Sequence, residues 1–156
     1  KPEQGNASLI PEYGEAAMSK KIGENDKISG VIDGWNFPFE TSYVAHLNGE
    51  SNFNSTVGIM SGSGLIKMSI DQNIKEGETY DIGATESDKK VRLEFDDTRQ
   101  GQPGNYMATS GKFAVLQLQV NTLLASLEFE AQNAQDPQKK MSFTQGAYKV
   151  EDFKHV

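Results

Sequence analysis

The sequence predicts an all-β protein, either an antiparallel β-sandwich or a closed β-barrel of about eight to ten strands, with a mostly irregular N-terminal tail. From Ile28 onward, apolar residues recur at every second position, which is the period of a strand with one buried face. The breaks between these segments are rich in Gly, Asn, Asp and Pro, which favour turns. A parallel sheet is excluded, because its crossover connections would need helices.

The chain length allows one domain of this kind, because 156 residues can bury a sufficient core. Residues 27–156 are expected to form a single β domain. Residues 1–26 mix Pro and Gly with charged and small residues, without a sustained apolar period, and are expected to form a tail or tether. Within the tail, residues 12–21 place acids first and lysines last, which is typical of a short helix.

Alternation identifies the strands in chain order. The clearest alternating segments are 43–47, 66–70, 90–97, 112–120 and 123–131. In the segment 112–120, Leu116 and Leu118 alternate with glutamines, whereas Phe113 and Val115 fall on the glutamine face. A β-bulge near Ala114 would bring both sets of apolar residues to one face.

Turn residues mark the connections between these strands. Hairpin turns are predicted at Asn48-Gly49, Gly62-Ser63-Gly64 and Asn121-Thr122. Further loops are predicted around Asp26, Gly34, Gly77, Gly101–Gly104 and Asp136-Pro137.

The composition argues against several classes of function. With 15 basic and 22 acidic residues the net charge is −7, which is the wrong sign for nucleic acid or an anionic membrane. No apolar run is long enough to span a membrane. The chain has no Cys and two His, so no metal site and no cofactor are predicted.

No catalytic residues are predicted, and the protein is not expected to be an enzyme. Ser61 precedes a Gly-Ser-Gly turn, but the sequence departs from the Gly-x-Ser-x-Gly pattern of a nucleophile elbow. His46 is the one candidate base within the domain, and a structural histidine is the favoured interpretation. The segment 71–77 is rich in oxygen ligands but lacks the spacing of a calcium loop.

Aromatic residues supply the candidate binding site. The segment 34–39 gathers one Trp, two Phe and a Pro without clear alternation, directly after the first strand. Such a cluster either binds a ligand or plugs one end of the fold, and the plug is the favoured interpretation. The candidate ligand-binding residues are Trp35, Phe37, Phe39, Tyr80 and Tyr106.

The C-terminal segments have a recognisable pattern. In residues 109–115, 123–131 and 141–150, small residues and Gly precede alternating aromatics, and Thr144-Gln145-Gly146-Ala147-Tyr148 reads Thr-x-Gly-x-aromatic. This part resembles secreted bacterial lipoprotein domains of unknown function, and the resemblance implies a β-rich envelope domain. Gly146 is expected to allow a bulge or close approach, and Tyr148 to return an aromatic ring to the core.

The expected location is therefore secreted, periplasmic or on the bacterial cell surface. A lipid-modified cysteine just upstream of Lys1 would make residues 1–26 a tether. A chain without cysteine fits an oxidising compartment.

Three functional hypotheses follow. The leading one is a non-enzymatic binding domain that recognises a protein or small ligand through loops or a sheet face. An alternative is a barrel that carries an apolar small ligand in an interior pocket lined by Trp35, Phe39, Met68 and Leu127. Another is an acidic inhibitor or immunity protein for a basic partner, which the net charge would steer toward it.

Overall fold

A computed structural model describes residues 21–86 and 88–155. These residues form an all-β fold without a helix, which confirms the predicted class. The strands, in chain order, are β1 (Lys21–Gly23), β2 (Lys27–Ile32), β3 (Phe39–Glu40), β4 (Tyr43–Leu47), β5 (Phe53–Met60), β6 (Gly64–Asp71), β7 (Thr79–Gly83), β8 (Val91–Asp97), β9 (Gly104–Gln119), β10 (Thr122–Asn133) and β11 (Lys140–Val150).

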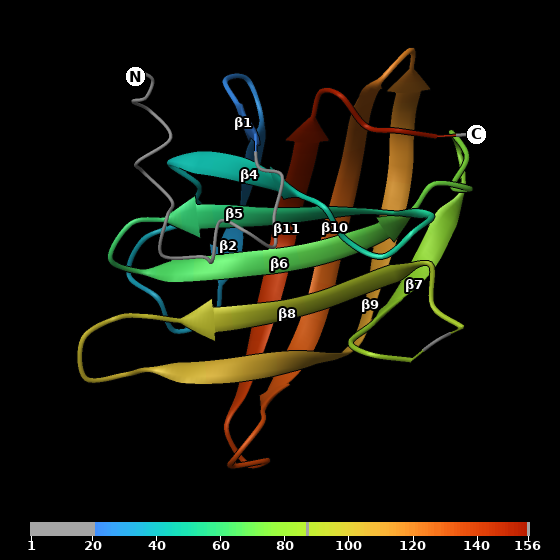
Figure 1. Ribbon diagram of the computed structural model, residues 1–156. Helices are drawn as coiled ribbons and strands as arrows, with labels where there is room; N and C mark the ends of the chain where they lie inside the picture. The colour runs from blue at the N-terminus through green and yellow to red at the C-terminus, as the bar shows by residue number, and fades with distance from the viewer. Residues whose placement is uncertain (1–20, 87, 156) are drawn as a thin grey trace.

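All of these strands belong to one strongly curled half-barrel sheet, in the order β1-β4-β5-β6-β8-β7-β9-β10-β11-β2-β3. Figure 1 shows a front layer of β4, β5, β6 and β8 crossing a back layer of β2, β11, β10 and β9. The pairings are antiparallel, except for two residue pairs between β7 and β8. A loop connects β7 to β8, and a parallel pairing this short does not require a crossover helix.

Two residues between β3 and β4 link the opposite edges of the curled sheet. The backbone N–H of Thr41 donates to the carbonyl oxygen of Ile28 on β2, at 3.0 Å. The next N–H, of Ser42, donates to the carbonyl oxygen of Ile59 on β5, at 2.6 Å. The chain therefore crosses from one edge of the sheet to the other at this point.

The core fills the space inside the curl. Strands β6 and β8 alternate between buried and half-buried residues along their whole length, as predicted. Aromatic rings meet edge to face within the core, with 5.3 Å between the ring centres of Phe39 and Phe95 and 5.6 Å between those of Phe113 and Tyr148.

Strand β9 contains two β-bulges, and one of them lies two residues beyond Ala114, near the predicted position. One lies at Thr109, between Ala108 and Ser110, and the other at Leu116. The second bulge leaves Leu116 exposed at 63% and keeps Phe113 and Val115 in the core. The alternating pattern required an extra residue in this segment, and the structure places it between Val115 and Leu118.

Two turns also differ from their predicted positions. The β9–β10 turn consists of Val120 and Asn121, one residue earlier than predicted. The β4–β5 connection is a loop over residues 48–52, with a positive φ of 76° at Asn52.

The described chain begins in a strand. Strand β1 lies within the segment 1–26 that was predicted to be a tail, and its residues pair with β4. Residues 1–20, with nearly all of the helix predicted over 12–21, lie outside the described residues.

Candidate functional site

Aromatic side chains gather at one end of the barrel, around the connection from β2 to β3. The chain turns there at Gly34, whose φ of 88° favours glycine. The turn places the Trp35 ring edge to face against three phenylalanines. The ring centres lie 5.5 Å from Phe37, 6.4 Å from Phe39 and 6.0 Å from Phe95. We call this part of the molecule the aromatic end.

An arginine from the turn after β8 covers the tryptophan. The guanidinium carbon of Arg99 lies 4.3 Å from the centre of the Trp35 ring. Its Nε and a terminal nitrogen donate to the two carboxylate oxygens of Asp97, at 3.0 and 2.9 Å. The hydrogen bond to Asp97 raises the pKa of Arg99 and helps keep the guanidinium charged.

A small cleft lies beside this pair, with a volume of about 170 Å³. Its walls include Trp35, Tyr106, Asp33, Lys140 and Met141. Pockets for drug-sized ligands occupy roughly 300–1,000 Å³, so this cleft has room for one side chain rather than for such a molecule.

Two apolar side chains on β2 and the β2–β3 connection are exposed. Phe37 is 42% exposed, although its ring contacts Trp35. Val31 on β2 is 41% exposed and follows Gly30, which pairs with Phe39. Phe39 itself is fully buried, so the core is already covered beneath Phe37.

The structure brings four of the five predicted site residues together. The Trp35 ring contacts both Phe37 and Phe39, and Tyr106 lines the cleft beside Trp35. Tyr80 lies apart from them. It pairs with Phe113, which is seven residues from Tyr106 along β9. At the rise of a strand, seven residues correspond to a length of roughly 24 Å along β9. The hydroxyl of Tyr80 accepts a hydrogen bond from the backbone N–H of Lys75, at 2.9 Å.

Sequence reasoning did not identify Arg99 or Asp97 as part of this site. Asp97 ends the alternating strand β8 and Arg99 follows it in a segment without a motif, so only the fold carries Arg99 to the face of Trp35. An Arg two residues after an Asp is too common a pattern to predict a binding site from the sequence.

The residues expected to line an interior pocket belong to the packed core. Phe39, Met68 and Leu127 are members of one buried cluster that joins both layers, and Trp35 packs against its rim. Side chains therefore occupy the positions at which an interior ligand was expected to bind.

Wider depressions lie elsewhere on the surface. One of about 440 Å³ is lined by outward residues of β5, β6 and β8, among them Lys67 and Glu94. Burial lowers the pKa of Lys67, but hydrogen bonds and charges from Asp96 and Glu94 outweigh it, so that the pKa is raised. The ammonium lies 3.0 Å from Asp96 and 3.4 Å from Glu94, so these acids compete with any ligand for its charge.

His46, predicted to be a structural histidine, lies in a network of polar contacts. Its Nε2 contacts the buried carboxylate of Asp26. The other oxygen of that carboxylate accepts the backbone N–H of Glu151, at 2.8 Å. This carboxylate therefore joins β4 to the segment that follows β11.

Within residues 21–86 and 88–155, no group of three or more His, Cys, Asp or Glu side chains is placed to hold a metal ion. No helix in that part of the chain could cross a membrane. Comparisons with protein-family models, with curated proteins and with solved structures give no match to this chain.

Proposed function

We propose that this protein is a non-enzymatic binding domain that recognises a protein partner through its aromatic end. The observation that carries the proposal is the exposure of Phe37 above a core that Phe39 already covers. The Phe37 ring packs against Trp35 on one side, and its exposed side is available to a partner.

The residue types around Phe37 support this function. Trp, Tyr and Arg dominate the binding energy of protein interfaces, and Trp35, Tyr106 and Arg99 surround one cleft here. Because Asp97 and Trp35 hold the guanidinium in place, Arg99 would lose little conformational freedom on binding.

A protein fits this site better than a small ligand does. The cleft of about 170 Å³ would accept a single side chain of the partner, while Phe37 and Val31 would contact its surface. The net charge of −7 would favour a partner with a basic surface, by accelerating the encounter.

We also propose that the protein acts outside the cytoplasm, in the bacterial envelope or beyond it. The support is the absence of cysteine and the resemblance of its last strands to secreted lipoprotein domains.

Photocrosslinking tests the binding function. The photoreactive residue p-benzoylphenylalanine replaces Phe37 in one variant and Leu116, an exposed apolar residue of β9, in the control. Each variant is irradiated with the envelope and extracellular fractions of the host. We expect an adduct of defined mass from position 37 and none of that mass from position 116.

The crosslinked protein is then purified, and its affinity is measured by titration calorimetry. Phe37→Ser should weaken binding by at least about tenfold, as at an interface hot spot, whereas Leu116→Ser should leave it unchanged. Equal adducts at both positions, or unchanged binding by Phe37→Ser, would refute recognition through the aromatic end.

A further inference from the structure

The loop between β4 and β5 contains an asparagine followed by a glycine. Asn48 and Gly49 are both exposed, and they lie just beyond the last ladder pair of the two strands, Leu47 with Ser55. An asparagine in this position can react with its own chain, because glycine has no side chain to shield its backbone nitrogen. Whether that reaction occurs in the folded protein depends on how the loop is held.

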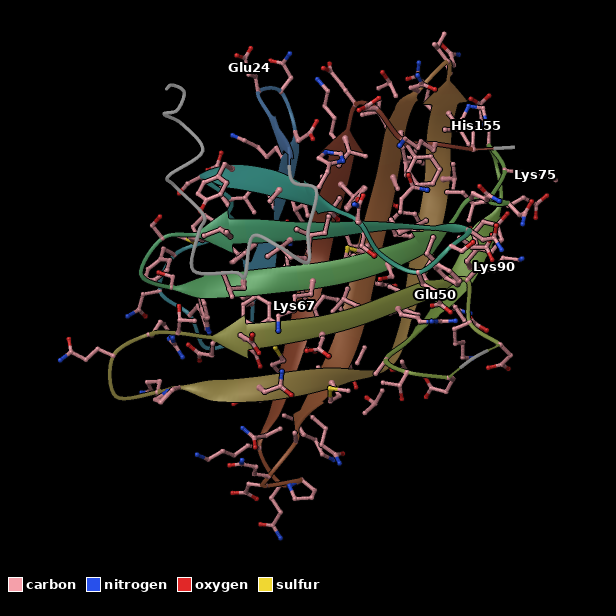
Figure 2. All side chains as sticks on the ribbon, in the orientation of Figure 1. Glu24, Glu50, Lys67, Lys75, Lys90 and His155 are labelled. Atoms are coloured by element: carbon pink, nitrogen blue, oxygen red, sulfur yellow. The ribbon has the colours of Figure 1, made fainter. Side chains whose placement is uncertain are left out.

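Fixed contacts hold the loop after the dipeptide. The carboxylate of Glu50 accepts a hydrogen bond from a terminal nitrogen of Arg92, at 2.9 Å, and Figure 2 labels Glu50 beside the end of β8. Further along, the carbonyl oxygen of Asn52 accepts the backbone N–H of Gln72, at 2.8 Å. The dipeptide therefore lies between the strand ladder on one side and these contacts on the other.

Other asparagines have side chains that hydrogen bonds hold in place. Asn54 makes two hydrogen bonds with the backbone of the segment after β11, and the amide of Asn105 donates to Asp96 at 2.6 Å. Within residues 21–86 and 88–155, no hydrogen bond fixes the side-chain amide of Asn48 or the N–H of Gly49. The side-chain carbonyl carbon of Asn48 can therefore rotate toward the backbone nitrogen of Gly49 without breaking a contact.

The packing of the loop requires the glycine. A Cβ atom at position 49 would lie 2.2 Å from the Oγ atom and 2.9 Å from the Cβ atom of Ser55 on β5. The hydroxyl of Ser55 lies in turn 3.0 Å from that of Ser69 on β6. A residue with a side chain would have to displace this pair or move the loop away from the sheet. The fold therefore keeps Gly49 at the position where it leaves the reaction unhindered.

We propose that Asn48 deamidates in the folded protein, to a mixture of isoaspartate and aspartate. The backbone nitrogen of Gly49 attacks the side-chain carbonyl carbon of Asn48 and gives up its proton. As this C–N bond forms, the bond to the side-chain nitrogen breaks, and that nitrogen leaves with the proton as ammonia. The product is a succinimide ring. Water then opens the ring at the backbone carbonyl, which gives isoaspartate, or at the side-chain carbonyl, which gives aspartate.

Either product changes the surface around the loop. A new carboxylate appears two residues before Glu50, on the border of the depression of about 440 Å³ that Asn48 and Gly49 help to line. Isoaspartate also adds one carbon atom to the backbone of the loop. The ladder of β4 with β5 ends before Asn48, so the sheet itself should stay intact.

The test compares the folded protein with the same chain unfolded in urea. Both are incubated in mildly alkaline buffer, which favours loss of the amide proton, and peptides are followed by mass spectrometry. Isoaspartate is measured by enzymatic methylation with L-isoaspartyl methyltransferase. We expect Asn48 to deamidate in the folded protein within about tenfold of its rate in the unfolded chain, because a loop without anchoring contacts opens at little cost.

Two controls assign the reaction to this dipeptide. Asn121 is also exposed, in the β9–β10 turn, but is followed by Thr122, whose branched side chain shields the backbone nitrogen. It should remain unmodified while Asn48 reacts. Asn48→Gln should remove the product, since its longer side chain would have to form a larger ring, which closes far more slowly.

Three results would overturn the proposal. A rate in the folded protein more than about tenfold below that of the unfolded chain would show that the loop holds Asn48 away from the reactive geometry. Aspartate without isoaspartate would show direct hydrolysis by water rather than attack by Gly49. Equal deamidation at Asn121 would show that exposure alone controls the reaction.

Discussion

At the scale of single residues, a hydrogen bond between two hydroxyl groups lies inside the curled sheet. The hydroxyl groups of Tyr148 on β11 and Thr56 on β5 lie 2.9 Å apart, and both residues are buried. Tyr148→Phe should lower the free energy of unfolding by about 1–3 kcal/mol, because it leaves the Thr56 hydroxyl without its partner. The double variant Tyr148→Phe, Thr56→Val should recover most of that loss. Urea unfolding measures both, and equal losses in the single and double variants would contradict this explanation.

The same tyrosine makes stability depend on alkaline pH. Burial raises the pKa of Tyr148 well above its ordinary value of 10.0. Above about pH 10 the unfolded chain therefore loses this proton while the folded protein keeps it, so stability falls as the pH rises, by up to about 1.4 kcal/mol per pH unit. Tyr148→Phe lacks this dependence, so its difference from the wild type should narrow above pH 10. Parallel stability curves from pH 8 to 11.5 would show that Tyr148 is not responsible.

At the scale of strands, the pairing of β10 with β11 depends on a glycine. Between Leu127 and Phe129 the register shifts, and Gln145 on the opposite strand has a positive φ of 54°. A Cβ atom at Gly146 would lie against the carbonyl oxygen and side chain of Leu127, well inside contact distance. This confirms the close approach that was predicted for Gly146, and Tyr148 is buried in the core as expected.

Gly146→Ala should therefore destabilise the protein by about 1–3 kcal/mol, since the added methyl group forces the two strands apart. The neighbouring Ala147→Ser, at an exposed position, should change stability by less than about 0.5 kcal/mol. Denaturant midpoints with unchanged slopes provide the measurement. A Gly146→Ala variant as stable as Ala147→Ser would mean that the strands separate at little cost.

Strands with one buried face were predictable, and features set by distant contacts were not. In β8, Val91, Leu93 and Phe95 alternate with charged residues, and the structure buries all three. Strand β1 has three residues and depends on pairing with β4, so no local pattern identifies it. At the aromatic end, Trp35 was recognisable as an aromatic residue after a turn. The contribution of Arg99 arises only when β8 and the β2–β3 connection meet.

At the scale of the whole molecule, the two ends of the barrel are closed by different segments. At the aromatic end, Phe39 and Trp35 cover the core. At the opposite end, the segment after β11 crosses the opening and buries Phe153, whose N–H donates to the carbonyl oxygen of Asn121 at 2.7 Å. The side-chain amide of Asn54 holds this segment by two hydrogen bonds with the backbone of Lys154, at 2.8 and 2.9 Å.

Asn54→Ala should release this closing segment while the sheet stays folded. Each lost hydrogen bond is worth about 0.5–1.5 kcal/mol, so hydrogen exchange at the amide of Phe153 should accelerate by roughly tenfold or more. Amides in the middle of β6 and β8 exchange only through global unfolding, so they report the free energy of unfolding of the whole domain. That free energy should fall by no more than about 3 kcal/mol. Ser51→Ala, in the exposed loop before β5, is the matched control and should leave the Phe153 amide as slow as in the wild type. If the Phe153 amide exchanges no faster in Asn54→Ala, the buried ring and the hydrogen bond to Asn121 hold the closing segment, and the asparagine is dispensable.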